Sequence, residues 1–148
     1  MPTSARVLSV SVGEALYQPL HPFHVFLLGG AVSFLVSGVL SDWAYFSTNE
    51  IQWKNFASWL LMGGLVLAGF ALLWALIDLF RADRDRARPI IYFLLLLTAW
   101  ILGFIDELIH AKDAWGSMPE ALIVSAIVAV LAIAATGFGF STMRAGGR

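Results

Sequence analysis

The stretch that decides the fold is Phe56–Phe80, FASWLLMGGLVLAGFALLWALIDLF, in which Asp78 is the only charged residue. A run of about 20 apolar residues spans the hydrocarbon core of a membrane as a helix. Spanning segments are helices or closed barrels, and this run lacks the alternation of barrel strands. It is therefore predicted to be a transmembrane helix. Three further apolar runs, Phe23–Leu40, Pro89–Ile109 and Pro119–Phe140, predict three more.

Composition excludes a soluble bundle. The chain has 148 residues, 59% of them hydrophobic, and a mean hydropathy of +0.81. Four helices without a polar stripe cannot be buried in so short a soluble chain. We predict one all-α membrane domain over residues 21–141, preceded by a cytoplasmic or interfacial segment (residues 1–20) and followed by a cytoplasmic tail (residues 142–148). The short charged turn Arg81–Arg88 predicts that the second and third helices are antiparallel neighbours, as in an antiparallel four-helix bundle.

The basic residues predict the orientation. Seven of the nine fall on one side of the four spans, and both lysines, Lys54 and Lys112, fall on the other. By the positive-inside rule the arginine side is cytoplasmic, and both termini lie there. Met1–Leu20 has no apolar core with a small-residue cleavage site, so no cleavable signal peptide is expected. The seven arginines are Arg6, Arg81, Arg84, Arg86, Arg88, Arg144 and Arg148.

The outer side is predicted to carry any functional site. Its first loop is expected at Ser41–Asn55, about 15 residues and long enough to hold a site. The second is expected at His110–Met118. Together they would gather carboxylates, a histidine and aromatic rings around one outer mouth: Asp42, Trp43, Tyr45, Trp53, Asp106, His110, Asp113 and Trp115.

Ionisable residues at membrane depth are costly and so indicate a partner or a task. Asp106 and His110 are four residues apart and share a helical face. Such a pair suits proton transfer, metal or haem ligation, or simple capping of a helix end. Asp78 is expected to form a structural ion pair with the arginine turn that begins at Arg81, and a proton relay is the alternative.

Haem b is a candidate cofactor, with His110, His24, His21 and Met62 as candidate ligands. His21 and His24 open the first span from inside, whereas His110 closes the third outside, so the core thickness of about 30 Å separates them. One haem therefore cannot join His24 to His110 of the same chain. Met62, near the outer end of the second span, or a second subunit would have to supply the other ligand. No complete metal-ligand set and no nucleophile–base pair is apparent, so catalysis is not expected.

Small residues recur on single helical faces and let helices approach closely. The pattern favours packing within the chain, and a homo-oligomer interface is the alternative. The residues are Gly29, Ser33 and Ser37 in the first span, Gly64, Ala68, Ala71 and Ala75 in the second, and Ser125, Ala129 and Ala132 in the fourth.

Two motifs resemble the bacterial membrane family catalogued as domain of unknown function 2231. They are His21-Pro22 at the start of the first span and the turn from His110 to Trp115, HAKDAW. The resemblance covers nearly the whole chain from His21 onward and implies a four-helix protein of the bacterial inner membrane. Similar domains tend to occur with exported redox proteins, such as quinoprotein sugar dehydrogenases or Rieske-type proteins, which implies a redox context.

Three hypotheses follow. The first is a non-enzymatic membrane subunit or anchor whose acidic, aromatic outer face docks a periplasmic redox protein. The second is an electron-transfer protein that binds haem b or quinone. The third is a small channel or transporter that uses Asp106, His110 and Asp78 as a proton or metal path. All three have the lipid bilayer as a partner, and none involves nucleic acid.

Overall fold

The computed structural model describes residues 21–81, 87–112 and 114–145, with the side chains of 114–115 and 142–145 left out. All regular structure in these ranges is helical. Four α-helices are each long and apolar enough to cross a membrane. They are α2 (Pro22–Thr48), α3 (Ile51–Arg81), α4 (Ala87–His110) and α5 (Glu120–Ala145), and a short 3-10 helix, η1 (Ala114–Ser117), precedes α5.

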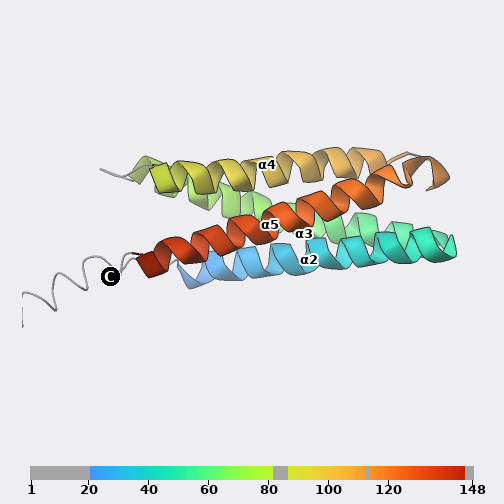
Figure 1. Cartoon of the computed structure of the whole chain (residues 1–148), viewed down its shortest axis with the longest axis horizontal. Coiled ribbons are helices and arrows are strands. Elements are labelled where there is room, and N and C mark those ends of the chain that lie inside the picture. Colours follow the sequence, from blue (N-terminus) through green and yellow to red (C-terminus); the bar gives the residue numbers. More distant parts are fainter. Residues whose placement is uncertain (1–20, 82–86, 113, 146–148) are drawn as a thin grey trace, which may run out of the picture.

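The four helices form one elongated bundle (Figure 1). Each helix begins at the end of the bundle where the preceding helix ends. Helix α2 packs against α3 and α5, and α4 packs against the same two helices. Helices α2 and α4 therefore face each other across the diagonal of the bundle. We call its two ends the His24 end, where α2 and α4 begin, and the His110 end, where they finish.

The predicted loop Ser41–Asn55 is wrong, because almost all of it is helical. Helix α2 continues to Thr48 and α3 starts at Ile51, which leaves only Asn49 and Glu50 between them. Asn49 adopts the left-handed conformation, with φ of 60°, and its N–H donates to Tyr45 O at 2.8 Å. This is the usual C-terminal cap of a helix. Helix α2 continues beyond the apolar run that ends at Leu40, because the bundle buries the polar residues that follow, Ser41 and Asp42.

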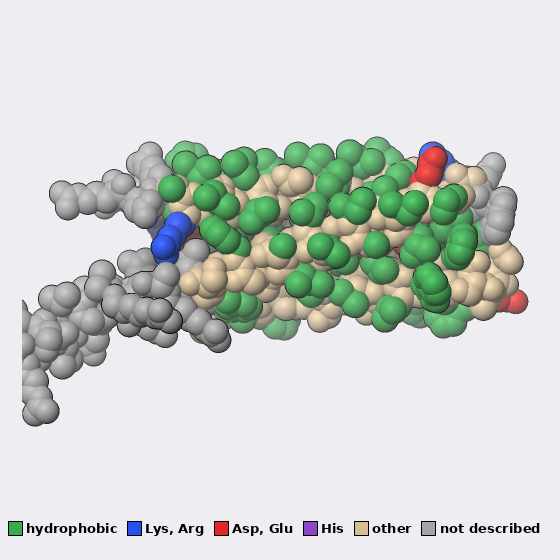
Figure 2. Space-filling view, viewed as in Figure 1, with side chains coloured by type: hydrophobic (Ala, Val, Ile, Leu, Met, Phe, Trp, Pro, Cys, Tyr) green, Lys and Arg blue, Asp and Glu red, His purple; other side chains and the backbone are tan. Residues whose placement is uncertain are grey.

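The interior is filled by leucines and by small residues, and the large apolar side chains point outward. Residues such as Trp59 and Phe80 are more than three-quarters exposed. Figure 2 shows hydrophobic side chains along the whole visible face and charged side chains near the two ends. An apolar exterior of this extent is the surface of a helix bundle whose solvent is lipid.

Small residues set the closest helix contacts. A Cβ placed at Gly64 would lie 2.9 Å from Leu35 Cγ, so α2 and α3 pack tightly there. The small face predicted in the first span behaves differently. Gly29 has nothing within 4 Å of a Cβ, so it does not serve packing within the chain.

Two side-chain pairs cross the diagonal in matching register. His24 on α2 contacts Tyr92 on α4, and Asp42 on α2 contacts His110 on α4. Both pairs are separated by 68 residues in the sequence. Along each helix the two contacts are 18 residues apart, which is five turns of 3.6 residues and about 27 Å. Each helix therefore turns the same face to the interior at both levels.

Candidate functional site

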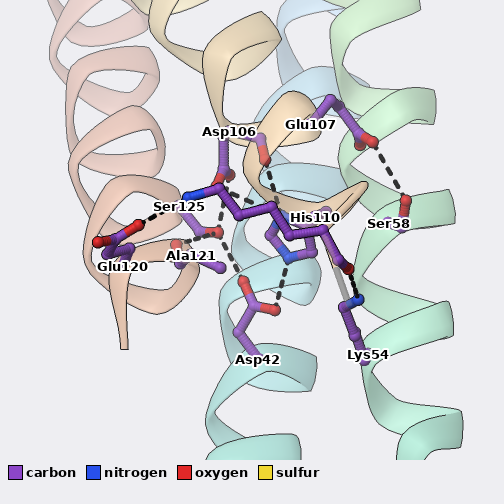
Figure 3. Close-up of polar contacts among 10 residues, drawn as sticks. Asp42, Lys54, Ser58, Asp106, Glu107, His110, Glu120, Ala121 and Ser125 are labelled. Carbon is purple, nitrogen blue, oxygen red and sulfur yellow. Dashed lines mark hydrogen bonds and ion pairs between the residues drawn. The ribbon is translucent and has the colours of Figure 1, made fainter. Parts of the chain in front are cut away.

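The His110 end contains a closed ring of four buried polar side chains, Asp42, Asp106, His110 and Ser125, which we call the polar ring (Figure 3). Asp42 comes from α2, Asp106 and His110 from α4, and Ser125 from α5. The side chains of both carboxylates and of the imidazole are fully buried, and Ser125 is also inaccessible. One turn of α4 separates Asp106 from His110, so both point into the interior.

His110 contacts both carboxyl residues. Its Nδ1 lies 2.9 Å from the backbone oxygen of Asp106 and 3.4 Å from Asp106 Oδ1. A carbonyl oxygen only accepts hydrogen bonds, so Nδ1 carries a hydrogen and donates it. Nε2 lies 2.8 Å from Asp42 Oδ1. The proton in this second bond is held either by His110, which is then an imidazolium, or by the carboxyl group of Asp42. A small movement of the proton along the bond converts one form into the other.

Ser125 closes the other side of the ring. Its Oγ lies 2.6 Å from Asp42 Oδ2, 2.8 Å from Asp106 Oδ2 and 2.9 Å from Ala121 O. A hydroxyl has one hydrogen and two lone pairs. If Ser125 donates to one carboxylate, the other carboxyl must donate to Ser125. If it donates to Ala121 O, both carboxyls must donate. The two contacts to the carboxyls are both hydrogen bonds only when at least one carboxyl is protonated.

Proton counting gives the charge of the polar ring. One proton lies between His110 and Asp42, and a second is needed beside Ser125. With these two shared protons, the two carboxyls and the imidazole together carry no net charge. A neutral cluster avoids the large cost of burying an unpaired charge. In the polar ring, protons are thus shared through short hydrogen bonds, and these protons can be placed in more than one way.

Helix α3 adds a second polar layer beside the ring. Ser58 Oγ donates to Glu107 Oε2 at 3.1 Å, and Lys54 Nζ donates to the backbone oxygen of Lys112 at 2.7 Å. Lys54 is buried in the first turn of α3 and not in a loop, whereas Lys112 is exposed and pairs with Glu120 at 3.0 Å. Figure 3 shows the contacts of Ser58 and Lys54 on the α3 side of His110, and Glu120 on the α5 side.

The His24 end holds a smaller polar cluster. His24 is fully buried, and its Nε2 lies 2.7 Å from the Tyr92 hydroxyl. Trp74 lies against both histidines of this end, with ring centroids 5.1 Å from His21 and 6.0 Å from His24. His21 itself caps α2, since its Nδ1 accepts the N–H of Phe23 at 3.3 Å.

Apolar side chains separate the two clusters. In the described part of the interior between them, leucines and alanines pack from all four helices, among them Leu35, Leu61, Leu96, Ala71 and Ala132. A cavity of about 10 Å³ within this layer has apolar walls. Apolar cavities of this size stay dry. The two clusters are therefore distinct sites with no shared hydrogen-bond chain among the described residues.

The structure brings together three of the residues predicted for the outer site, Asp42, Asp106 and His110. Tyr45 is buried nearby on α2, but Trp43 and Trp53 are 61% and 43% exposed on the outside of the bundle. The remaining two predictions, Asp113 and the side chain of Trp115, lie outside the described residues.

The predicted structural pair at the His24 end is only partly within the described chain. Asp78 and Arg81 are both exposed there. Asp78 interacts electrostatically with His24 and Tyr92. Arg84 and Arg86 lie outside the described residues, so the ion pair with the arginine turn stays a prediction. Residues 1–20, Arg148 and the side chain of Arg144 also lie outside the described part of the chain, so what the sequence predicts for them stays a prediction.

The candidate haem ligands lie apart. His24 and His110 are at opposite ends, about five helical turns from each other. Both ring nitrogens of His110 already have hydrogen-bond partners. Met62 is 45% exposed on the outer surface of α3, so it does not reach into the polar ring. Ligation of iron by His110 would require the loss of its bond to Asp42.

Ser125 is the site residue that sequence reasoning missed, because it was interpreted only as a small packing residue. Glu107, Ser58 and Tyr92 were likewise not singled out. A signal was available for two of them. Ser125 is the one hydroxyl residue in the run from Ala121 to Ala135, and Glu107 is an ionisable residue within the predicted span Pro89–Ile109.

Comparisons with known proteins place the chain in a family. No curated protein and no solved structure matches it significantly. A family model described as "Predicted membrane protein (DUF2231)" matches residues 18–144, which include all the described helices except the last residue of α5. The resemblance drawn from the His21-Pro22 start and the His110 turn is thereby confirmed. The chain belongs to the DUF2231 family of predicted membrane proteins.

Proposed function

We propose that this protein is a proton-binding subunit of the bacterial inner membrane. In this proposal four antiparallel helices span the bilayer, both termini lie in the cytoplasm, and the polar ring takes up and releases a proton near the periplasmic face. The observation that carries it is the position of Ser125, whose single hydroxyl hydrogen cannot satisfy two carboxylates and a carbonyl at once. A carboxyl proton is required to complete the ring.

The composition of the ring supports a proton-handling role over a purely structural one. Apolar residues of the same volume commonly stabilise a protein interior as well as a buried ionic group does, or better. Ionisable residues inside membrane spans are rare and most often mark proton or ion sites. The ring joins two carboxyls, an imidazole and a hydroxyl through short hydrogen bonds. Carboxyl and imidazole groups exchange protons readily.

Infrared spectroscopy of the protein in liposomes tests this proposal. We expect a carbonyl stretching band of a protonated carboxyl at neutral pH, shifted by D₂O, and removed or displaced in both Asp106→Asn and Asp42→Asn. Glu50→Gln, at an exposed acid in the link between α2 and α3, is the matched control and should leave the band unchanged. Absence of any such band in the wild-type protein would overturn the proposal.

The charge distribution supports the proposed orientation. Arg81 and Arg88 are exposed at the His24 end, and Glu50 and Glu120 are exposed at the other. Basic residues favour the cytoplasmic side. An alkaline phosphatase or fluorescent protein fused after Arg148 should report a cytoplasmic C-terminus. Activity of the phosphatase fusion would reverse the orientation.

Docking of a periplasmic redox protein is a second candidate function. The predicted acidic face is smaller than its sequence indicates, because Asp42 and Asp106 are buried and Glu120 pairs with Lys112. Glu50 and Trp53, side by side at the turn between α2 and α3, stay exposed and support docking there. The double variant Glu50→Gln, Trp53→Ala should lose co-purification of a periplasmic partner. Unchanged co-purification would count against this surface.

Electron transfer through haem b or quinone is the third candidate function. The structure favours it least, because both ring nitrogens of His110 are already hydrogen-bonded and are not free to bind iron. An absorption spectrum of detergent-purified protein from haem-replete cells decides the haem version. A Soret band that changes on reduction and disappears in His110→Ala would favour it over proton binding alone. We expect a colourless preparation.

A further inference from the structure

The polar ring needs a route to water, because all of its side chains are inaccessible. A proton can enter a buried site only through a group that is itself titratable or hydrogen-bonded and that reaches nearer the surface. Glu107 is placed for this task. It follows Asp106 directly on α4, and it is half-buried, whereas Asp106 is fully buried.

Glu107 has one satisfied and one free oxygen. Its Oε2 accepts from Ser58 on α3, whereas Oε1 is buried and has no hydrogen-bond partner. Asp106 Oδ1 is the oxygen of the polar ring that likewise has no hydrogen-bond partner. Glu107 Oε1 thus has no partner, and Asp106 Oδ1, although 3.4 Å from His110 Nδ1, makes no hydrogen bond. An unpaired buried carboxyl oxygen is costly in a structural role, and it leaves room for a proton to bind.

The surroundings of Glu107 are those of a group linked to the ring. His110, Asp106 and Asp42 all interact with it electrostatically, and Ser58 bonds to it from α3. Lys54, one turn before Ser58 on α3, is directed to the backbone oxygen of Lys112. No cation is therefore paired with Glu107 among the described residues.

We propose that Glu107 is the residue through which protons pass between water and the polar ring. The inference rests on the proposed proton-binding function. In uptake, a hydronium ion gives its proton to the Glu107 carboxylate and is left as water. The new O–H bond of Glu107 then breaks as an O–H or N–H bond forms in the ring, and the Glu107 carboxylate is restored. Release runs in reverse, and no electron is transferred. Ser58 is the positioning residue that holds the carboxylate between α3 and α4.

The test is the rate at which the ring carboxyl exchanges hydrogen for deuterium. Protein in liposomes is mixed rapidly with D₂O, and the shift of the protonated-carboxyl band is followed in time by infrared spectroscopy. We expect Glu107→Gln to slow the shift by about tenfold or more, the lower end of what a positioned acid or base contributes to proton transfer. Glu107→Asp, which keeps the carboxyl, should restore most of the rate.

The controls make each outcome decisive. Glu50→Gln should exchange at the wild-type rate. An unchanged rate in Glu107→Gln, with the carboxyl band intact, would overturn the role of Glu107 and leave the proton-binding function standing. Absence of the band in the wild-type protein would overturn both. If Glu107→Gln fails to fold, Ser58→Ala serves instead. It is expected to slow exchange several-fold, and a wild-type rate there would equally overturn the proposal.

Discussion

Ser125 Oγ lies 2.6 Å from Asp42 Oδ2, although the two residues are 83 positions apart and belong to different helices. The same oxygen lies 2.8 Å from Asp106 Oδ2. One hydroxyl on α5 therefore joins a carboxyl on α2 to a carboxyl on α4. Three of the four helices therefore meet at this buried polar point.

Asp106 is expected to tolerate an amide but not an alanine. In Asp106→Asn the amide N–H can donate to Ser125 as a protonated carboxyl would, so the free energy of unfolding should change by less than about 1 kcal/mol. Asp106→Ala leaves Ser125 short of a partner and removes the 3.4 Å contact of Asp106 Oδ1 with His110, so it should cost about 1–3 kcal/mol. Unfolding in mixed micelles with increasing SDS measures both. Equal losses in the two variants would contradict a protonated carboxyl at this position.

Ser125→Ala is expected to destabilise the protein by about 1–3 kcal/mol, because it leaves two buried carboxyl oxygens without a partner. Ser47→Ala is the matched control. Its hydroxyl also bonds to the carbonyl four residues earlier, at 2.7 Å from Trp43 O, but it is exposed. The control should stay within about 0.5 kcal/mol of wild type. The same unfolding assay compares the two, and similar values would show that Ser125 matters only within its own helix.

Two glycines should respond in opposite ways to alanine. A Cβ at Gly103 would lie 2.6 Å from Cδ2 of Leu65, which is itself buried, so Gly103→Ala should cost about 1–3 kcal/mol. A Cβ at Gly29 meets nothing within 4 Å, and Gly29→Ala should stabilise its helix by up to about 1 kcal/mol. Thermal unfolding in detergent gives both values. Destabilisation by Gly29→Ala, or loss of self-association, would instead place this face against a second copy.

The two diagonal contacts should behave as independent sites. Tyr92→Phe removes the bond to His24 and Asp42→Asn alters the bond to His110, about 27 Å away along the helices. Their effects on the free energy of unfolding should add within about 0.5 kcal/mol. Asp42→Asn combined with His110→Ala should deviate from additivity by more than that, because the two residues share a hydrogen bond. Strong coupling between Tyr92 and Asp42 would contradict a dry apolar layer between the two clusters.

The chain's four apolar runs were enough to predict four membrane-length helices, because the hydropathy of a 20-residue window depends on sequence alone. The shared face of Asp106 and His110 was predictable for a similar reason, since the spacing of a helix places residues four apart on one side. The ends of the helices were not predictable from hydropathy. The stretch from Ser41 to Thr48 is polar and aromatic, yet it is helical, because Asp42 and Tyr45 are buried by neighbouring helices.

Local spacing, charge and hydropathy thus determined from the sequence that this protein is built of four apolar helices and that its third helix carries a carboxylate and an imidazole on one face. Only the tertiary structure decided that Asp42 and Ser125 complete the ring, and that Met62 points away from it. Which faces of α2, α4 and α5 meet depends on the register and rotation of whole helices. These are set by contacts between residues about 20 to 80 positions apart, such as those at Ser125, and no local pattern encodes them.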